Sequence, residues 1–120
     1  SGGERNRVAI ARALAANPRV LVLDEVSSGL DLITRSRLFA MLQQLQQATR
    51  LSYIVISHDL RVALQFGDSI TVMDSGRVVE QAHPKDLFAH PHHACTKGLL
   101  DAVTLSTGSS TPRREEDSTC

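Results

Sequence analysis

The segment from Val20 to Glu25 constrains the fold of this chain most, because four apolar residues run directly into two adjacent carboxylates. A short apolar run bounded by turn signals is typical of a strand buried on both faces. Two acids cannot continue such a strand into a core, since burying unpaired charge is costly. We therefore expect the strand to end at Asp24 and Glu25, on the edge where open α/β sheets bind ligands. The simpler alternative is a strand that stops before a helix with an acidic first turn.

The surrounding residues predict helices on either side of this strand. Ser1 and Glu4 have the spacing of a capping box, ahead of a helix that should run to about Ala16. A second helix, capped by Asp31, should reach about Gln47. Its apolar residues recur at helical spacing, and they are Leu38, Met41, Leu42 and Leu45.

The rest of the chain predicts a second buried strand, a short helix, a hairpin and two more short helices. The helix–strand–helix–strand–helix order favours an α/β fold with parallel strands and crossover helices. From residue 104 onward, Ser, Thr, Gly and charged residues replace apolar ones, which predicts a disordered tail. The expected elements are residues 53–56, 60–66 with a left-handed Gly67 after them, 69–73, 78–81, 84–88 and 94–102.

The charge and hydropathy of the chain exclude some classes of partner. Thirteen basic and thirteen acidic residues give a net charge of 0, so nothing global favours nucleic acid or an anionic membrane surface. No apolar run is long enough to span a bilayer. Any role at a membrane should therefore come through a partner.

Three features of the chain are compatible with phosphate chemistry. Glycines before a helix let the backbone approach a ligand, and the helix N-terminus offers N–H groups to an anion. Acids after a strand can hold a phosphate-bound Mg²⁺ and orient a water molecule. A histidine after a strand can hydrogen-bond a phosphate. Each has a simpler explanation by itself, as a capped helix, an acidic strand end or a solvated histidine, but their joint occurrence in this order is hard to explain independently.

With these features in place, roughly the first hundred residues resemble the ATP-binding cassette (ABC) family. Residues 1–5 look like its signature motif and residues 8–14 like the helix that follows. Residues 20–25 match the Walker B strand, residues 28–31 the D-loop, and residues 56–59 the switch-histidine segment. The resemblance implies the C-terminal part of a P-loop NTPase fold, with a C-terminal β-hairpin and short helices added to the parallel strands.

The resemblance also implies ATP and Mg²⁺ as cofactors and a role for each motif residue. Asp24 would support Mg²⁺, Glu25 would be the catalytic base, and His58 would sense the γ-phosphate. Asp31 would couple the two sites of a dimer. The signature residues would contact ATP bound to the opposite subunit, and they are Ser1, Gly2, Gly3 and Glu4.

The chain departs from the family pattern in three ways. Glu4 stands where Gln is usual, which adds negative charge near a phosphate site, and Val26 and Gly29 replace the commoner Pro and Ala. A Gly-x-x-x-x-Gly-Lys-[Ser/Thr] loop and a Q-loop segment do not occur in these 120 residues. Since that loop carries most phosphate affinity, we expect a fragment that binds ATP poorly and hydrolyses none, cut from a parent that does both.

Residues 90–100 resemble a segment of the oligopeptide, dipeptide and nickel importer ATPases, with Ala94 for Pro and Cys95 for Tyr. An alternative is direct metal binding by His90, His92 and His93. The resemblance divides the chain into an ATPase part at 1–82, an importer-type helical extension at 83–103 and the tail at 104–120.

The function implied is an ATPase subunit that energises import of peptides or nickel across a bacterial inner membrane. It would lie peripherally on the cytoplasmic face, paired with an identical or related ATPase subunit and with integral membrane permease subunits. A periplasmic binding protein would deliver the cargo, and no nucleic acid would be bound. The alternatives are an ABC ATPase of another transporter class, a soluble ABC ATPase of DNA repair or translation, and a non-catalytic regulatory remnant.

Overall fold

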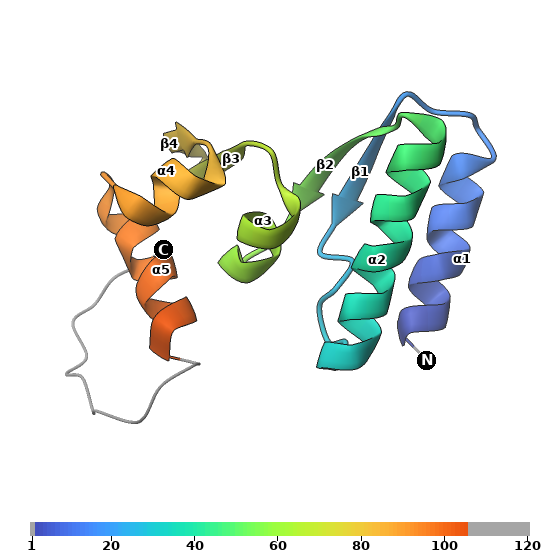
Figure 1. Cartoon of the computed structure of the whole chain (residues 1–120), viewed down its shortest axis with the longest axis horizontal. Helices are drawn as coiled ribbons and strands as arrows, with labels where there is room; N and C mark the ends of the chain where they lie inside the picture. The colour runs from blue at the N-terminus through green and yellow to red at the C-terminus, as the bar shows by residue number, and fades with distance from the viewer. Residues whose placement is uncertain (1, 106–120) are drawn as a thin grey trace. The chain divides into compact units, whose positions relative to one another are not determined.

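The computed structural model describes residues 2–105, which fall into two compact units that divide between His58 and Asp59. Figure 1 shows the elements of each unit. Among residues 2–105, no helix is both long and apolar enough to cross a lipid bilayer. The expected domain boundaries at residues 82 and 103 stay a prediction.

The first unit is a parallel strand pair with helices before and between the strands. Its elements are α1 (Gly2–Leu14), β1 (Val20–Asp24), α2 (Leu32–Thr49) and β2 (Ser52–Ile56). β1 and β2 pair in parallel from Val20↔Ser52 to Asp24↔Ile56, which confirms the predicted pairing. The α2 crossover supplies the connection that two parallel strands require. The α/β fold class is therefore confirmed.

Helices α1 and α2 lie side by side in this unit (Figure 1). The core beneath them is formed by Ile10, Leu21, Leu23, Leu38, Leu42 and Leu51, all nearly inaccessible to solvent. A polar contact adds to this packing, because the hydroxyl of Tyr53 on β2 donates to the carbonyl of Leu42 on α2, at 2.8 Å. Partial burial raises the pKa of this phenol.

The prediction that β1 is buried on both faces is wrong for the described chain. Leu21 and Leu23 are buried, but Val20 and Val22 are 51% and 56% exposed. On β2, Ile54 and Ile56 are similarly exposed. Within the first unit, the apolar run therefore has one covered face and one exposed face.

The second unit is built around an antiparallel hairpin. Its elements are α3 (Leu60–Phe66), β3 (Ile70–Asp74), β4 (Arg77–Ala82), α4 (Pro84–Ala89) and α5 (Ala94–Leu105). The hairpin turn has left-handed backbone at Ser75 and Gly76, the conformation that two-residue hairpins favour. Its core comprises Leu60, Ile70, Val72, Leu87, Cys95 and Leu100.

Several predicted element ends need correction. α1 ends at Leu14 rather than about Ala16, and α2 continues to Thr49, where Arg50 adopts the left-handed cap conformation. Gly67 is not left-handed: its φ is −85°. A Cβ there would lie 2.9 Å from the carbonyl oxygen of Ala63, so close backbone approach explains the glycine. α5 runs on through Thr104 and Leu105, and the remainder of the expected tail lies outside the described residues.

Candidate active-site edge

The two carboxylates that follow the first apolar run lie where β1 leaves the sheet. Asp24 is the last residue of β1 and is exposed. The N–H of Glu25 still donates to the carbonyl of Ile56 on β2, at 2.9 Å, but the φ angle of Glu25 is +50°. A left-handed conformation is uncommon for a residue other than glycine, and it turns the chain out of the strand direction here.

The structure brings Glu25 and His58 together across 33 positions of sequence. The backbone N–H of His58 donates to Oε1 of Glu25 at 3.1 Å. The ring atom Nδ1 of His58 lies 3.1 Å from Oε1 and 3.2 Å from Oε2 of the same carboxylate. Glu25 directly follows β1, and His58 lies two residues beyond the end of β2, so the parallel pairing of these strands positions both residues.

This pair is open to solvent, with the side chain of His58 79% exposed and that of Glu25 37% exposed. Exposed ion pairs contribute little to stability, so the contact matters for geometry rather than for folding. An ionised carboxylate only accepts hydrogen bonds, which assigns a proton to Nδ1 of His58. Its other ring nitrogen, Nε2, then remains for a ligand.

Asp31 has a structural role in the described chain as the N-cap of α2. Its Oδ1 accepts the backbone N–H of Thr34 at 2.7 Å, and its Oδ2 accepts the Thr34 hydroxyl at 3.0 Å. These two hydrogen bonds, first from the N–H and then from the hydroxyl, lower the pKa of Asp31. The cap confirms the predicted start of α2, whereas the coupling role of Asp31 across a dimer stays a prediction.

The glycines of the first motif open α1, and they pack against α2 and the turn before it. A Cβ on Gly3 would lie 2.9 Å from Cγ2 of Thr34, closer than side-chain atoms normally approach. A Cβ on Gly2 would make ordinary contact with Leu30. Gly3 thus has a packing reason to be glycine, independent of any phosphate. Glu4 lies in the first turn of α1, and Ser1 lies outside the described residues.

A contact that the sequence did not predict ties α1 to the site. The side-chain amide of Asn6 donates to the carbonyl of Val26, the residue after Glu25. The sequence carries no signal for it, since an asparagine among arginines on a helix is typical of a solvated face. The structure therefore brings the predicted residues together in two groups. Glu25 contacts His58, and the start of α1 packs against the Asp31–Thr34 cap of α2. The hydrogen bond from Asn6 to Val26 connects α1 to the turn that carries Glu25.

The histidines of residues 90–93 help to begin α5. Glu80 of β4 accepts the backbone N–H groups of His92 and His93 at 2.9 and 3.0 Å, and Nδ1 of His93 accepts the N–H of Cys95 at 3.0 Å. The nearby hydroxyl of Thr96, which falls short of full hydrogen-bond geometry, and then these N–H groups lower the pKa of Glu80 to about 2. Residues 2–105 contain no cluster of three potential metal ligands, so metal binding by these histidines gains no support.

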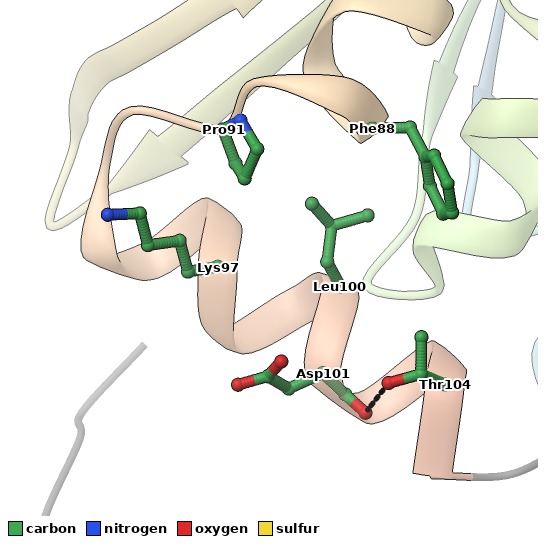
Figure 2. Close-up of a pocket in the computed structure, with 6 residues that line it drawn as sticks. All are labelled: Phe88, Pro91, Lys97, Leu100, Asp101 and Thr104. Atoms are coloured by element: carbon green, nitrogen blue, oxygen red, sulfur yellow. Dashed lines mark hydrogen bonds between the residues drawn. The ribbon is translucent and has the colours of Figure 1, made fainter. Parts of the chain in front are cut away.

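Figure 2 shows a hollow beside α5 in the second unit. The side chain of Leu100 points toward Phe88, and Lys97 and Asp101 extend from the same helix. The hydroxyl of Thr104 donates to the carbonyl of Asp101 at 3.0 Å. Pro91 completes the lining of this mainly apolar hollow.

Comparison with known proteins places these features in context. The family model described as ABC transporter matches residues 1–28. The methionine import ATP-binding protein MetN of Carboxydothermus hydrogenoformans is 41% identical over 103 residues, or 86% of this chain and 31% of the relative. The oligopeptide transport ATP-binding protein OppF of Lactococcus lactis is 41% identical, with 86% and 32% covered. The dipeptide transport ATP-binding protein DppF of Haemophilus influenzae is 43% identical, with the same coverage.

A solved structure is similar over the same length. It is cbiO1 from Clostridium perfringens, described as part of the ABC transporter complex cbiONQ, with a TM-score of 0.68 and 35% identity over 86% of this chain. The match covers 39% of that protein. The chain spans about a third of the length of the curated relatives it matches.

Proposed function

We propose that this chain is part of an ATP-binding domain of the ABC transporter family, to which its relatives belong, and that it supplies one half of a composite ATP-hydrolysing site in an importer. The observation that carries the proposal is the contact of Glu25 with His58 at the carboxyl edge of β1 and β2. Open α/β sheets bind their ligands at this edge. A carboxylate and an imidazole held together there have the chemistry to deprotonate water and to contact a phosphate.

Glu25 is the proposed base. Its Oε1 accepts two N–H groups of His58, while Oε2 has only the longer ring contact of 3.2 Å. A carboxylate oxygen has two lone-pair sites, so Oε2 retains one that could take a proton from water. Holding Oε1 from two directions orients the carboxylate, which is what a general base needs before its substrate arrives.

His58 is the proposed phosphate contact. With Nδ1 turned to Glu25, its Nε2 can donate to a phosphate oxygen when the ring is protonated. The exposure of the ring, 79%, leaves room for such a ligand. A phosphate at Nε2 and a water at Oε2 would then lie on the two sides of one fixed pair.

The residues present fit Mg²⁺ and ATP in part. Asp24 offers an exposed carboxylate at the strand end, and Mg²⁺ is usually held by one or two carboxylates together with substrate phosphates. Bound there, the ion would neutralise charge on the transferring phosphate. The backbone of Gly2 and Gly3 at the α1 start would contact ATP held by the opposite subunit, with Ser1 and Glu4 beside it.

The proposal requires nucleotide-binding residues beyond those in this chain. Its 120 residues contain no Gly-x-x-x-x-Gly-Lys-[Ser/Thr] loop to cradle the phosphates. We therefore expect the chain by itself to hydrolyse no ATP, and we assign hydrolysis to a whole subunit that includes such a loop. In that subunit Asp31 would lie near the dimer partner.

The relatives support a proposal for the cargo, the partners and the location of the subunit. Their names assign them to methionine import, oligopeptide transport and dipeptide transport, so the proposed cargo is a peptide or a similarly small solute, with nickel less directly supported. The subunit would dimerise with an identical or related ATPase subunit beneath integral membrane permease subunits. It would lie on the cytoplasmic face of the bacterial inner membrane, and a periplasmic binding protein would deliver the cargo.

The decisive test is Glu25→Gln in the whole subunit. We expect ATP turnover to be lost while ATP binding persists and a nucleotide-bound dimer accumulates, because the amide cannot accept the proton. The control is Asp68→Asn, which makes the same carboxylate-to-amide change at an exposed position of the second unit. Turnover by the Glu25→Gln protein at the rate of the Asp68→Asn protein would remove Glu25 from the base role.

A further inference from the structure

The turn that carries Glu25 is held in an unusual backbone conformation. Glu25 has a φ of +50°, and a non-glycine residue keeps this unfavourable conformation only where its surroundings hold it. Within the turn, the N–H of Ser28 donates to the carbonyl of Glu25 at 3.1 Å, and the N–H of Leu30 to the carbonyl of Ser27 at 3.2 Å. The side chain of Ser27 is buried, which fixes the middle of the turn.

The carbonyl of Val26 lies between these bonds and takes its hydrogen bond from a different element. Its donor is the side-chain amide of Asn6, in the second turn of α1. The two residues are 20 positions apart and both are partly buried, so water competes poorly for this contact. Loss of the donor would leave the Val26 carbonyl underpaired in a partly dry site.

We propose that Asn6 is a positioning residue that locks the Glu25 turn to α1. Its amide holds Val26, and Val26 fixes the backbone on which the Glu25 carboxylate meets His58. Because α1 begins with Gly2 and Gly3, the same contact joins the proposed phosphate-contacting end of the chain to the proposed base. The start of α1 and the Glu25 turn are then held in a fixed position relative to each other. The catalytic part of this inference rests on the proposed function, whereas the structural part does not.

The structural part can be tested on the 120-residue chain without nucleotide. We expect Asn6→Ala to speed amide hydrogen exchange at Glu25 and Ser28, and to shift the NMR signals of Glu25 and His58. Asn6→Gln keeps the donor on a longer side chain and should restore much of the protection. The control is Gln43→Ala, which removes an exposed amide from α2. Exchange at Ser28 in Asn6→Ala equal to that in Gln43→Ala would overturn the proposal.

The catalytic part needs the whole subunit. We expect Asn6→Ala to lower kcat for ATP hydrolysis about tenfold or more with KM for ATP nearly unchanged, because misplacing a catalytic group by about 1 Å can cost on the order of a hundredfold. Asn6→Gln should recover most of kcat. An Asn6→Ala protein with a lower melting temperature but the kcat of Gln43→Ala would show a merely structural role and contradict the proposal.

The two readouts separate this inference from the function it rests on. Failure of the proposed function would appear as unchanged turnover in Glu25→Gln, whatever Asn6 does. If Asn6 does not position the Glu25 turn, amide hydrogen exchange at Glu25 and Ser28 will be unchanged in Asn6→Ala, even in a subunit that hydrolyses ATP. Since the exchange experiment uses no nucleotide, it decides the structural proposal in either case.

Discussion

Glu80 shows how a single carboxylate organises a helix start in this chain. It lies on β4 and accepts the N–H groups of His92 and His93, which immediately precede α5. The charge suits a helix N-terminus, whose free N–H groups and dipole favour an anion. These contacts account for the His90–His93 segment as a structural connection, with the imidazole of His93 also capping Cys95.

The lowered pKa of Glu80 predicts a pH-dependent contribution to stability. Its pKa falls from 4.5 to about 2 on folding, so the ionised form is favoured in the folded state. The stabilisation is present above pH 4.5 and is lost as pH falls toward 2. We expect Glu80→Gln to lower the thermal midpoint at pH 7, with the difference from the parent chain shrinking below pH 4.5. Circular dichroism melts across this range provide the measurement.

Asp86→Asn is the matched control for that titration, because Asp86 is an exposed acid in the first turn of the neighbouring α4. Its melting curves should follow those of the parent chain below pH 4.5 more closely. A midpoint difference for Glu80→Gln that is the same at pH 2.5 and pH 7 would contradict the assigned cause.

At the level of elements, the α1–α2 contact depends on the absence of a side chain at Gly3. The first turn of α1 approaches α2 so closely that a Cβ on Gly3 would meet Cγ2 of Thr34 at 2.9 Å. Thr34 cannot easily turn away, because its hydroxyl donates to the capping carboxylate of Asp31. Gly3 therefore couples the position of α1 to the N-cap of α2.

This geometry predicts a compensating pair of substitutions. Gly3→Ala should destabilise the chain despite the higher helix propensity of alanine, because the new methyl group meets Thr34. Thr34→Ser removes Cγ2 and keeps the hydroxyl that bonds Asp31. We expect Gly3→Ala to cost less in a Thr34→Ser background, as measured by urea unfolding of the four proteins in the cycle. Equal costs in both backgrounds would show that the close approach is not the reason for glycine.

The attachment of α2 to the sheet predicts a large effect at Leu42. This side chain is fully buried in the first unit, and the carbonyl of Leu42 accepts the hydroxyl of Tyr53 on β2. Leu42→Ala should lower the free energy of unfolding by about 2–5 kcal/mol, from lost burial and the cavity left behind. Ile33→Ala is the control, since Ile33 is 66% exposed on the same helix and should cost far less. Denaturant unfolding would compare the two.

For the whole molecule, the most consequential surface is the open face of the first-unit sheet, formed by Val20, Val22, Ile54 and Ile56. All four are about half exposed on a strand pair whose other face is covered. Contiguous exposed apolar side chains of this kind mark surfaces that pack against something else.

This surface predicts that the isolated chain associates with itself. Replacing Val22 and Ile54 together by Thr keeps β-branched residues in the strands while removing apolar surface. We expect the double variant to bind less of a hydrophobic dye and to sediment closer to a monomer, with little loss of melting temperature. The comparison is Leu23→Thr, which alters the buried face and should unfold the chain. If the double variant associates as strongly as the parent chain, this face is not the surface through which the chain associates.

The sequence by itself determined the order of the elements, most of their extents, and the parallel pairing of β1 with β2. Local signals suffice for these, because apolar periodicity, turn residues and the two acids after Leu23 act over a few residues. The same signals placed Asp24 and Glu25 at the end of β1 and His58 just beyond β2. They also indicated a resemblance to the ABC family, and the comparisons find this chain similar to ABC transporter ATP-binding proteins.

Only the tertiary structure decided how these pieces meet. Glu25 and His58 form one hydrogen-bonded pair, although the motifs suggest separate roles for them, because adjacent parallel strands bring residues 33 positions apart to one edge. The left-handed Glu25 and the bond from Asn6 to Val26 depend on helix packing, which no local pattern encodes. Which face of an apolar strand is covered likewise depends on what packs there. Val20 and Val22 are as apolar as Leu21 and Leu23, yet only the leucines are buried.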